Sequence, residues 1–115
     1  MRKKILIIDD EVDFCTIMKG YFGKRNYDIL IAHNIQAGLV LLDETDADIL
    51  FLDNNLPDGN GWKFVPRIVE KSPRLRIILI SAHLHKSDFI STNENIIVLE
   101  KPISIKILEE TLSKK

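Results

Sequence analysis

Short apolar segments and amphipathic segments alternate along the whole chain. Five segments carry apolar residues at consecutive positions, namely 5–8 (ILII), 27–32 (YDILIA), 48–52 (DILFL), 76–81 (RIILIS) and 96–99 (IIVL). Strands exposed on one face alternate apolar and polar residues, whereas consecutive apolar residues are typical of strands covered on both faces. The pattern therefore predicts five strands of a parallel sheet that lies between two layers of helices.

The segment after the first predicted strand has the periodicity of a helix. Its apolar residues recur at i, i+3, i+4, i+7 and i+8, and they are Phe14, Ile17, Met18, Tyr21 and Phe22. This spacing predicts a helix with one buried face, and Gly23 is a candidate end. Cys15 is expected to pack in the core beside this face.

Four further helices are expected, each after one of the remaining strands. Asn34 is a candidate cap for the second helix, and Ser104 is a candidate cap for the last one. The third helix is expected over 61–71, with Pro66 close enough to its first turn to leave the helical hydrogen bonds intact. A fourth, short helix is predicted around 87–92, where the sequence is turn-like. Alternating strands and helices predict one three-layer α/β domain over 1–115.

Polar residues follow four of the five predicted strands. They are Asp9, Asp10, Asp53, Ser81 and Lys101. In parallel sheets ligands bind at the carboxyl ends of the strands, so these side chains are expected at one edge. Each alone is also common in a purely structural role, for instance at a helix cap. Together, three carboxylates, a hydroxyl and an ammonium suit a divalent cation and a transferring phosphoryl group.

The two adjacent carboxylates need an explanation of their own. Asp9 and Asp10 follow a strand directly. Two such charges about 4 Å apart repel by roughly 4 kcal/mol at an effective dielectric constant near 20. A bound cation would relieve this repulsion.

Composition and charge exclude several classes of protein. The chain has 115 residues, 16 of them basic and 17 acidic, and its net charge of −1 argues against direct nucleic-acid binding. No apolar stretch reaches the ~20 residues of a membrane span. The single cysteine fits a reducing compartment, so we expect a cytoplasmic protein. His33, His83 and His85 lack the spacing of zinc ligands.

The motifs at the strand ends resemble those of a known family. They are DDE at 9–11, D-x-x-L-P-D-G-x-G at 53–61, S-A at 81–82 and K-P at 101–102. In this combination and order, the chain is similar over nearly its whole length to the receiver domain of bacterial two-component response regulators. The resemblance implies a flavodoxin-like sheet with strand order 2-1-3-4-5.

The resemblance also implies a role for each site residue. Asp53 would accept a phosphoryl group from a sensor histidine kinase or a phosphotransfer protein. The implied Mg²⁺ ligands are Asp10 directly, Asp9 largely through water, Asp53, and the backbone carbonyl of Asn55. Lys101 would neutralise charge on the phosphoryl group, and the Ser81 hydroxyl would bind one of its oxygens. Such a chain phosphorylates itself and slowly loses the phosphoryl group, and it is not a turnover enzyme.

Other implied residues concern switching and access of water. Asn55 and His83 occupy positions that influence how water reaches the acyl phosphate in this family. The position three residues before Lys101 usually carries an aromatic residue but here is Val98. Pro102 is a candidate for a cis peptide bond, which family members have at this place.

Several alternatives remain open from the sequence. A flavin-binding domain is disfavoured because the acids from Asp9 to Asp13 would repel its phosphate. An aspartyl-phosphate phosphatase would need its nucleophile after the first strand. The stronger alternative is a degenerate receiver that binds a partner without phosphorylation, which Val98 favours. The downstream protein is not identified by the sequence, and a homodimer stays open.

Overall fold

A computed structural model describes residues 2–82 and 94–113 of the chain. The elements in order are β1 (Lys3–Ile8), α1 (Val12–Phe22), β2 (Tyr27–Ala32), α2 (Ile35–Glu44), β3 (Ile49–Asp53), β4 (Asn55–Leu56), β5 (Gly59–Asn60), the 3₁₀ helix η1 (Gly61–Phe64), α3 (Val65–Lys71), β6 (Arg76–Ser81), β7 (Ile96–Glu100) and α4 (Ile105–Ser113). Within these described ranges, no helix has the length and apolar character of a membrane span.

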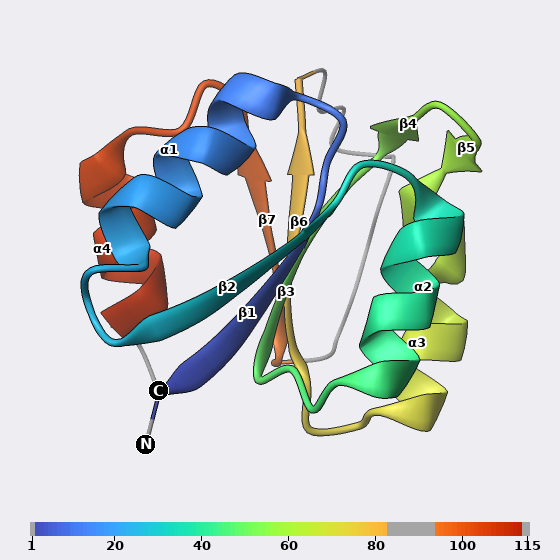
Figure 1. The fold of residues 1–115 in the computed structure, drawn as a ribbon. Coiled ribbons are helices and arrows are strands. Elements are labelled where there is room, and N and C mark those ends of the chain that lie inside the picture. Colours follow the sequence, from blue (N-terminus) through green and yellow to red (C-terminus); the bar gives the residue numbers. More distant parts are fainter. Residues whose placement is uncertain (1, 83–93, 114–115) are drawn as a thin grey trace.

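Five of the strands form one parallel sheet in the order β2-β1-β3-β6-β7. These are the five predicted strands, and their arrangement confirms the predicted order 2-1-3-4-5. The strands β4 and β5 form a separate antiparallel hairpin of two residues each, which the hydrophobic pattern did not predict. Helices α1 and α4 cover one face of the sheet, and α2 and α3 cover the other (Figure 1).

The two faces of the sheet each build their own core. In β3, Leu50 and Leu52 pack toward α2 and α3, whereas Ile49 and Phe51 pack toward α1 and α4. All four side chains are at most 3% exposed. Burial on both faces explains why β3 and its neighbours are apolar at consecutive positions.

The prediction for the buried face of α1 was wrong at one position. Ile17 is 53% exposed, whereas Cys15, Met18 and Phe22 are buried. Successive residues of a helix are rotated by about 100°, so Ile17 lies well away from the line of Met18 and Phe22. The buried face is therefore narrower than the full apolar stripe.

The predicted helix ends are confirmed where the structure describes them. The side chains of Asn34 and Ser104 each accept a hydrogen bond from the backbone N–H three residues later. The third helical segment begins as η1 and continues as α3, with Pro66 in the first turn of α3. The short helix predicted around 87–92 lies outside the described residues.

Candidate functional site

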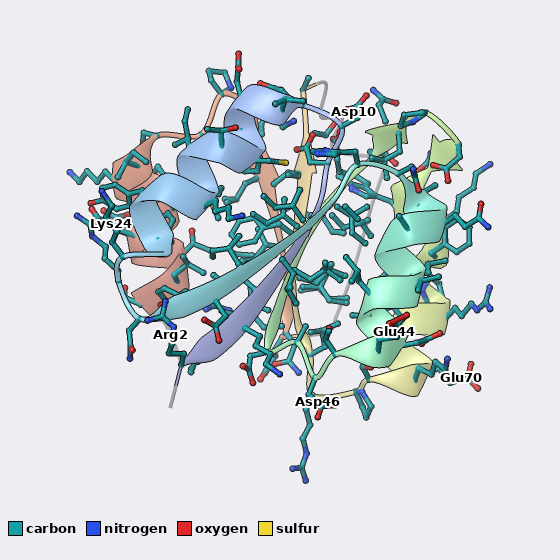
Figure 2. All side chains as sticks on the ribbon, in the orientation of Figure 1. Arg2, Asp10, Lys24, Glu44, Asp46 and Glu70 are labelled. Atoms are coloured by element: carbon teal, nitrogen blue, oxygen red, sulfur yellow. The ribbon has the colours of Figure 1, made fainter. Side chains whose placement is uncertain are left out.

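The carboxyl ends of four sheet strands bring the predicted polar residues to one edge. Asp9 follows β1, Asp53 ends β3, Ser81 ends β6 and Lys101 follows β7. Figure 2 shows Asp10 at this edge and Asp46 at the opposite end of the molecule. The topology thus places these residues together, as the sequence predicted from their positions after the strands.

Three carboxylates form a cluster that we call the acidic cluster, made of Asp9, Asp10 and Asp53. Each offers an oxygen, and these oxygens lie within 4.8 Å of one another. Asp9 is fully buried and Asp53 is 5% exposed, whereas Asp10 is exposed. The buried Asp9 Oδ2 is paired with the Lys101 ammonium at 2.8 Å. Because Mg²⁺ prefers a few carboxylates and retains several waters, the acidic cluster fits this ion.

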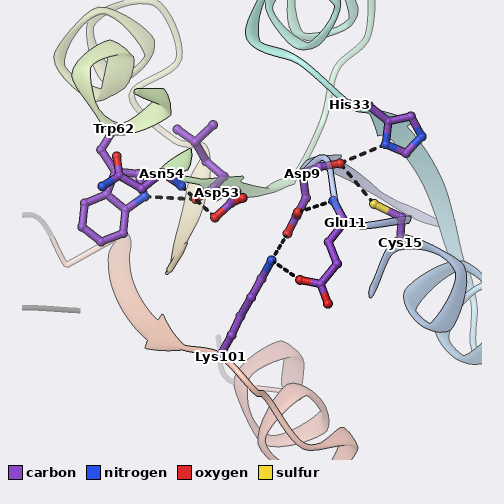
Figure 3. Close-up of polar contacts among 9 residues, drawn as sticks. Asp9, Glu11, Cys15, His33, Asp53, Asn54, Trp62 and Lys101 are labelled. Atoms are coloured by element: carbon purple, nitrogen blue, oxygen red, sulfur yellow. Dashed lines mark hydrogen bonds and ion pairs between the residues drawn. The ribbon is translucent and has the colours of Figure 1, made fainter. Parts of the chain in front are cut away.

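The Lys101 ammonium lies against two acids of the β1–α1 connection. Its Nζ is 2.8 Å from Asp9 Oδ2 and 3.0 Å from Glu11 Oε2, and the latter contact is a hydrogen bond (Figure 3). Burial lowers the pKa of Lys101, but pairing with Asp9 and Glu11 outweighs burial, and the pKa is raised overall. Glu11 is a site residue that the sequence analysis missed, and its only signal was the third acid of the DDE motif.

Asp53 is destabilised in its ionised form. Burial and the charge of Asp9 raise its pKa from 3.8 to about 6, against the opposing effects of Lys101 and of the Asn54 backbone. The backbone N–H of Asn54 donates to Asp53 Oδ1 at 2.9 Å. The site therefore holds more negative charge than its own Lys101 neutralises, which favours the binding of a cation.

The Ser81 residue is 2% exposed and lies next to the end of β3. Asp53 pairs with Ile80 in the β3–β6 register, so Ser81 is one position further toward the site. The Ser81 carbonyl accepts a hydrogen bond from the Lys101 backbone N–H at 2.8 Å. The last residues of β6 and β7 are thereby held at the edge where the acidic cluster lies.

The chain after Asp53 turns sharply through the hairpin of β4 and β5. Gly59 has a φ of 141°, a conformation that residues with a side chain rarely adopt. A Cβ on Gly61 would lie 2.2 Å from the Asp53 carbonyl oxygen, so only glycine permits this approach. Gly59 and Gly61 thus bring the hairpin back against the end of β3.

The indole of Trp62 also contacts the end of β3. Its Nε1 donates a hydrogen bond to the Leu52 carbonyl at 3.2 Å, and the side chain is buried (Figure 3). Trp62 belongs to the buried core cluster on the α2 and α3 side of the sheet. Trp62 therefore supports the strand end that carries Asp53.

The residues predicted to act in switching and in access of water do not belong to the acidic cluster. Asn55 is exposed in β4, where it pairs with Asn60. Val98 pairs with Leu79 inside the sheet and is partly buried. The Lys101–Pro102 peptide bond is cis. His83 lies outside the described residues.

Comparison with known proteins identifies the class of protein. Residues 5–113 match the model of the response regulator receiver domain, so the chain belongs to this family, as its motifs predicted. Members of this family are signalling modules of two-component systems.

Two curated relatives are longer than this chain. The response regulator protein PilR of Pseudomonas aeruginosa is 32% identical over 82 residues, which are 71% of this chain and 18% of PilR. The photosynthetic apparatus regulatory protein RegA of Rhodobacter capsulatus is 27% identical over 81 residues, 70% of this chain and 44% of RegA. The chain thus spans less than half the length of these relatives.

Solved structures share the fold. A two-component response regulator from Clostridium difficile has a TM-score of 0.86 at 24% identity, covering 96% of this chain and 93% of that one. The response regulator TrrA from Thermotoga maritima, solved in complex with Mg²⁺ and BeF, has a TM-score of 0.83 at 27% identity, with 96% of both chains covered. The sheet order and the helix layers are therefore those of receiver domains.

Proposed function

We propose that this chain is a phosphoacceptor that uses Asp53 as its nucleophile. The observation that carries the proposal is the acidic cluster, whose three carboxylate oxygens lie within 4.8 Å of one another with the Lys101 ammonium 2.8 Å from Asp9. The donor is a phosphohistidine of a sensor kinase or of a phosphotransfer protein. A downstream protein then recognises the phosphorylated form.

The transfer requires mainly positioning and neutralisation of charge. An oxygen of Asp53 attacks phosphorus, and the bond from phosphorus to the donor nitrogen breaks with its electron pair remaining on nitrogen. A Mg²⁺ ion, held by the acidic cluster and the backbone carbonyl of Asn55, would supply positive charge beside the phosphoryl oxygens. The Mg²⁺ in the complex of the Thermotoga relative supports such an ion here.

Lys101 and Ser81 are proposed to bind the transferred group. The Lys101 ammonium is held by Asp9 and Glu11, and the Glu11 contact would restrain its movement toward a phosphoryl oxygen. The Ser81 hydroxyl would bind a second oxygen and draw the end of β6 toward the phosphoryl group. Asn55 and His83 are proposed to set how fast water attacks the acyl phosphate.

A second candidate function is a receiver that binds its partner without phosphorylation. The observation that favours it is Val98, which lies partly buried in β7 where the family usually has an aromatic residue. A valine has no ring that could change position when Ser81 moves. The binding module would keep the fold and dispense with the switch.

The experiment that separates the two candidates is intact mass spectrometry after incubation with acetyl phosphate. We expect one phosphoryl adduct in the presence of Mg²⁺ and none with a chelator. Asp53→Asn should abolish the adduct, and Asp10→Asn should reduce it by weakening Mg²⁺ binding. An unmodified wild-type chain at every donor concentration would favour the phosphorylation-independent module.

A further inference from the structure

The carboxylate of Asp58 caps a helix that is remote from it in the sequence. Asp58 lies in the turn between β4 and β5, and its Oδ1 and Oδ2 accept hydrogen bonds from the backbone N–H groups of Ile35 and Gln36 at 2.8 and 3.0 Å. These are the first two residues of α2. The first N–H groups of a helix have no partner within the helix, so Asp58 satisfies two of them.

The remaining N–H groups of this helix end are satisfied locally. The Asn34 side chain accepts from Ala37 at 2.8 Å, and the Asn34 carbonyl accepts from Gly38 at 3.1 Å. The cap of α2 thus consists of a local part from Asn34 and a remote part from Asp58. Of the two parts of this cap, only the one from Asp58 links the start of α2 to a distant segment, the turn between β4 and β5.

The helix end that Asp58 binds is itself held against the acidic cluster. The segment between β2 and α2 contains His33, whose Nδ1 lies 2.9 Å from the Asp9 carbonyl oxygen. The Asp9 backbone N–H donates to the Ala32 carbonyl at 3.0 Å. The start of α2 is therefore fixed relative to Asp9, independently of Asp58.

The hairpin that carries Asp58 also carries the proposed carbonyl ligand of the metal. Asn55 in β4 pairs with Asn60 in β5, and Leu56 pairs with Gly59. Asp58 lies in the two-residue turn that connects these paired strands. The hairpin is short, and its residues other than Leu56 are exposed. Leu56 packs in the core and the Gly61 N–H donates to the Asn54 carbonyl at 2.9 Å, and the Asp58 carboxylate adds the hydrogen bonds that tie the hairpin to α2.

We propose that Asp58 is a positioning residue for the metal site. By binding the hairpin to the start of α2, it holds the Asn55 carbonyl at a fixed place relative to Asp9, and so it increases affinity for Mg²⁺. This inference rests on the proposed function, because it assumes that the acidic cluster and the Asn55 carbonyl bind Mg²⁺ together. By linkage, Mg²⁺ binding in turn stabilises the contact between Asp58 and α2.

The alternative is that Asp58 has only a structural role as a cap of α2. Asn34→Ala is a matched control, because it removes a cap hydrogen bond from the same helix end and leaves the hairpin contact intact. A pure capping role predicts that both variants lower stability and that neither changes Mg²⁺ affinity. The positioning role predicts a change in affinity for the Asp58 variants alone.

The test is calorimetric titration of Mg²⁺ into wild type, Asp58→Asn, Asp58→Ala and Asn34→Ala. We expect about tenfold weaker binding for Asp58→Ala, at the low end of the range for residues that orient a metal ligand. Asp58→Asn keeps one acceptor oxygen and should show a smaller loss. Repeating the titration at about 0.1 and about 1 M salt separates positioning from long-range charge, because exposed charges are screened within about 3 Å at the higher concentration.

The outcomes of the titration distinguish a positioning role of Asp58 from a purely capping role. Weaker binding by the Asp58 variants at both salt concentrations, with Asn34→Ala equal to wild type, supports the proposal. Equal affinity of Asp58→Asn and Asp58→Ala to wild type, a loss that disappears at high salt, or an equal loss in Asn34→Ala would overturn it. A wild-type chain that does not bind Mg²⁺ would overturn the proposed function as well.

A second measurement needs no variant that could fail to fold. Hydrogen exchange of the wild-type amides is followed by NMR with and without Mg²⁺. The amides of Ile35 and Gln36, which donate to Asp58, should exchange several times more slowly when Mg²⁺ is bound. The amide of Ala37, which donates to Asn34, should change less. Equal changes at all three amides would contradict the proposal.

Discussion

Replacing Asp53 by asparagine should make the protein more stable in the absence of metal. Burial and the charge of Asp9 raise the pKa of Asp53 from 3.8 to about 6 in the folded protein. The unfolded chain therefore loses this proton more readily than the folded protein does. At neutral pH, ionised Asp53 is a cost to folding that an uncharged asparagine avoids.

The expected size follows from the difference between the two pKa values. At about 1.4 kcal/mol for each tenfold change in proton affinity, a rise from 3.8 to about 6 corresponds to roughly 3 kcal/mol. The amide of asparagine must also be accommodated, so we expect a gain of about 2 kcal/mol in the free energy of unfolding. The gain should be full above about pH 6, decline between about pH 6 and pH 4, and vanish below that range.

Urea unfolding of wild type and Asp53→Asn, with a chelator and from about pH 4 to about pH 7.5, measures this difference. Asp46→Asn is the matched control, because Asp46 is exposed at the opposite end of the molecule (Figure 2). That variant should stay within about 0.5 kcal/mol of wild type. The reasoning is refuted if wild type and Asp53→Asn have the same free energy of unfolding at neutral pH, or if the difference between them does not change with pH. Saturating Mg²⁺ should narrow the gap, because the ion stabilises the wild-type site.

Two further substitutions test the geometry around Asp53. Glu11→Gln removes one carboxylate partner of Lys101. An exposed ion pair contributes up to about 1 kcal/mol, so acetyl phosphate should phosphorylate this variant up to about fivefold faster. An unchanged or slower rate of phosphorylation, measured by mass spectrometry, would exclude a restraint by Glu11. Gly61→Ala places a Cβ 2.2 Å from the Asp53 carbonyl oxygen and should lower the free energy of unfolding in urea by about 3 kcal/mol. Gly20→Ala is its control, because a Cβ there meets nothing within 4 Å, and that variant should be no less stable than wild type.

The fold and the main site residues could be predicted because their signals are local. Consecutive apolar residues mark strands buried on both faces, and the parallel topology then places everything that follows a strand at one edge. Asp9, Asp53, Ser81 and Lys101 were found in this way. Helix caps such as Asn34 and Ser104 were predicted because a cap and its partner lie three residues apart.

The contacts that the sequence did not predict join distant residues. Glu11 and Lys101 are 90 residues apart, and Asp58 lies 23 residues from Ile35. No periodicity relates such positions, and a charged residue in a turn reads as an ordinary exposed residue. The exposure of Ile17 was missed for a different reason, since the width of a buried helix face depends on the neighbouring elements.

The backbone hydrogen bond from Lys101 to Ser81 has a consequence for how the chain tolerates length variation. It belongs to the pairing of β6 and β7, in which Ser81 lies opposite Glu100 at one strand spacing of roughly 4.8 Å, and Lys101 is the next residue. This spacing is set inside the sheet and not by the 14 residues that connect the strands. Insertions or deletions in that connection would change the free-energy cost of closing it by about a few tenths of a kcal/mol. The ends of β6 and β7 would keep their separation. Relatives with connections of different lengths can therefore keep the same backbone positions for the serine and the lysine.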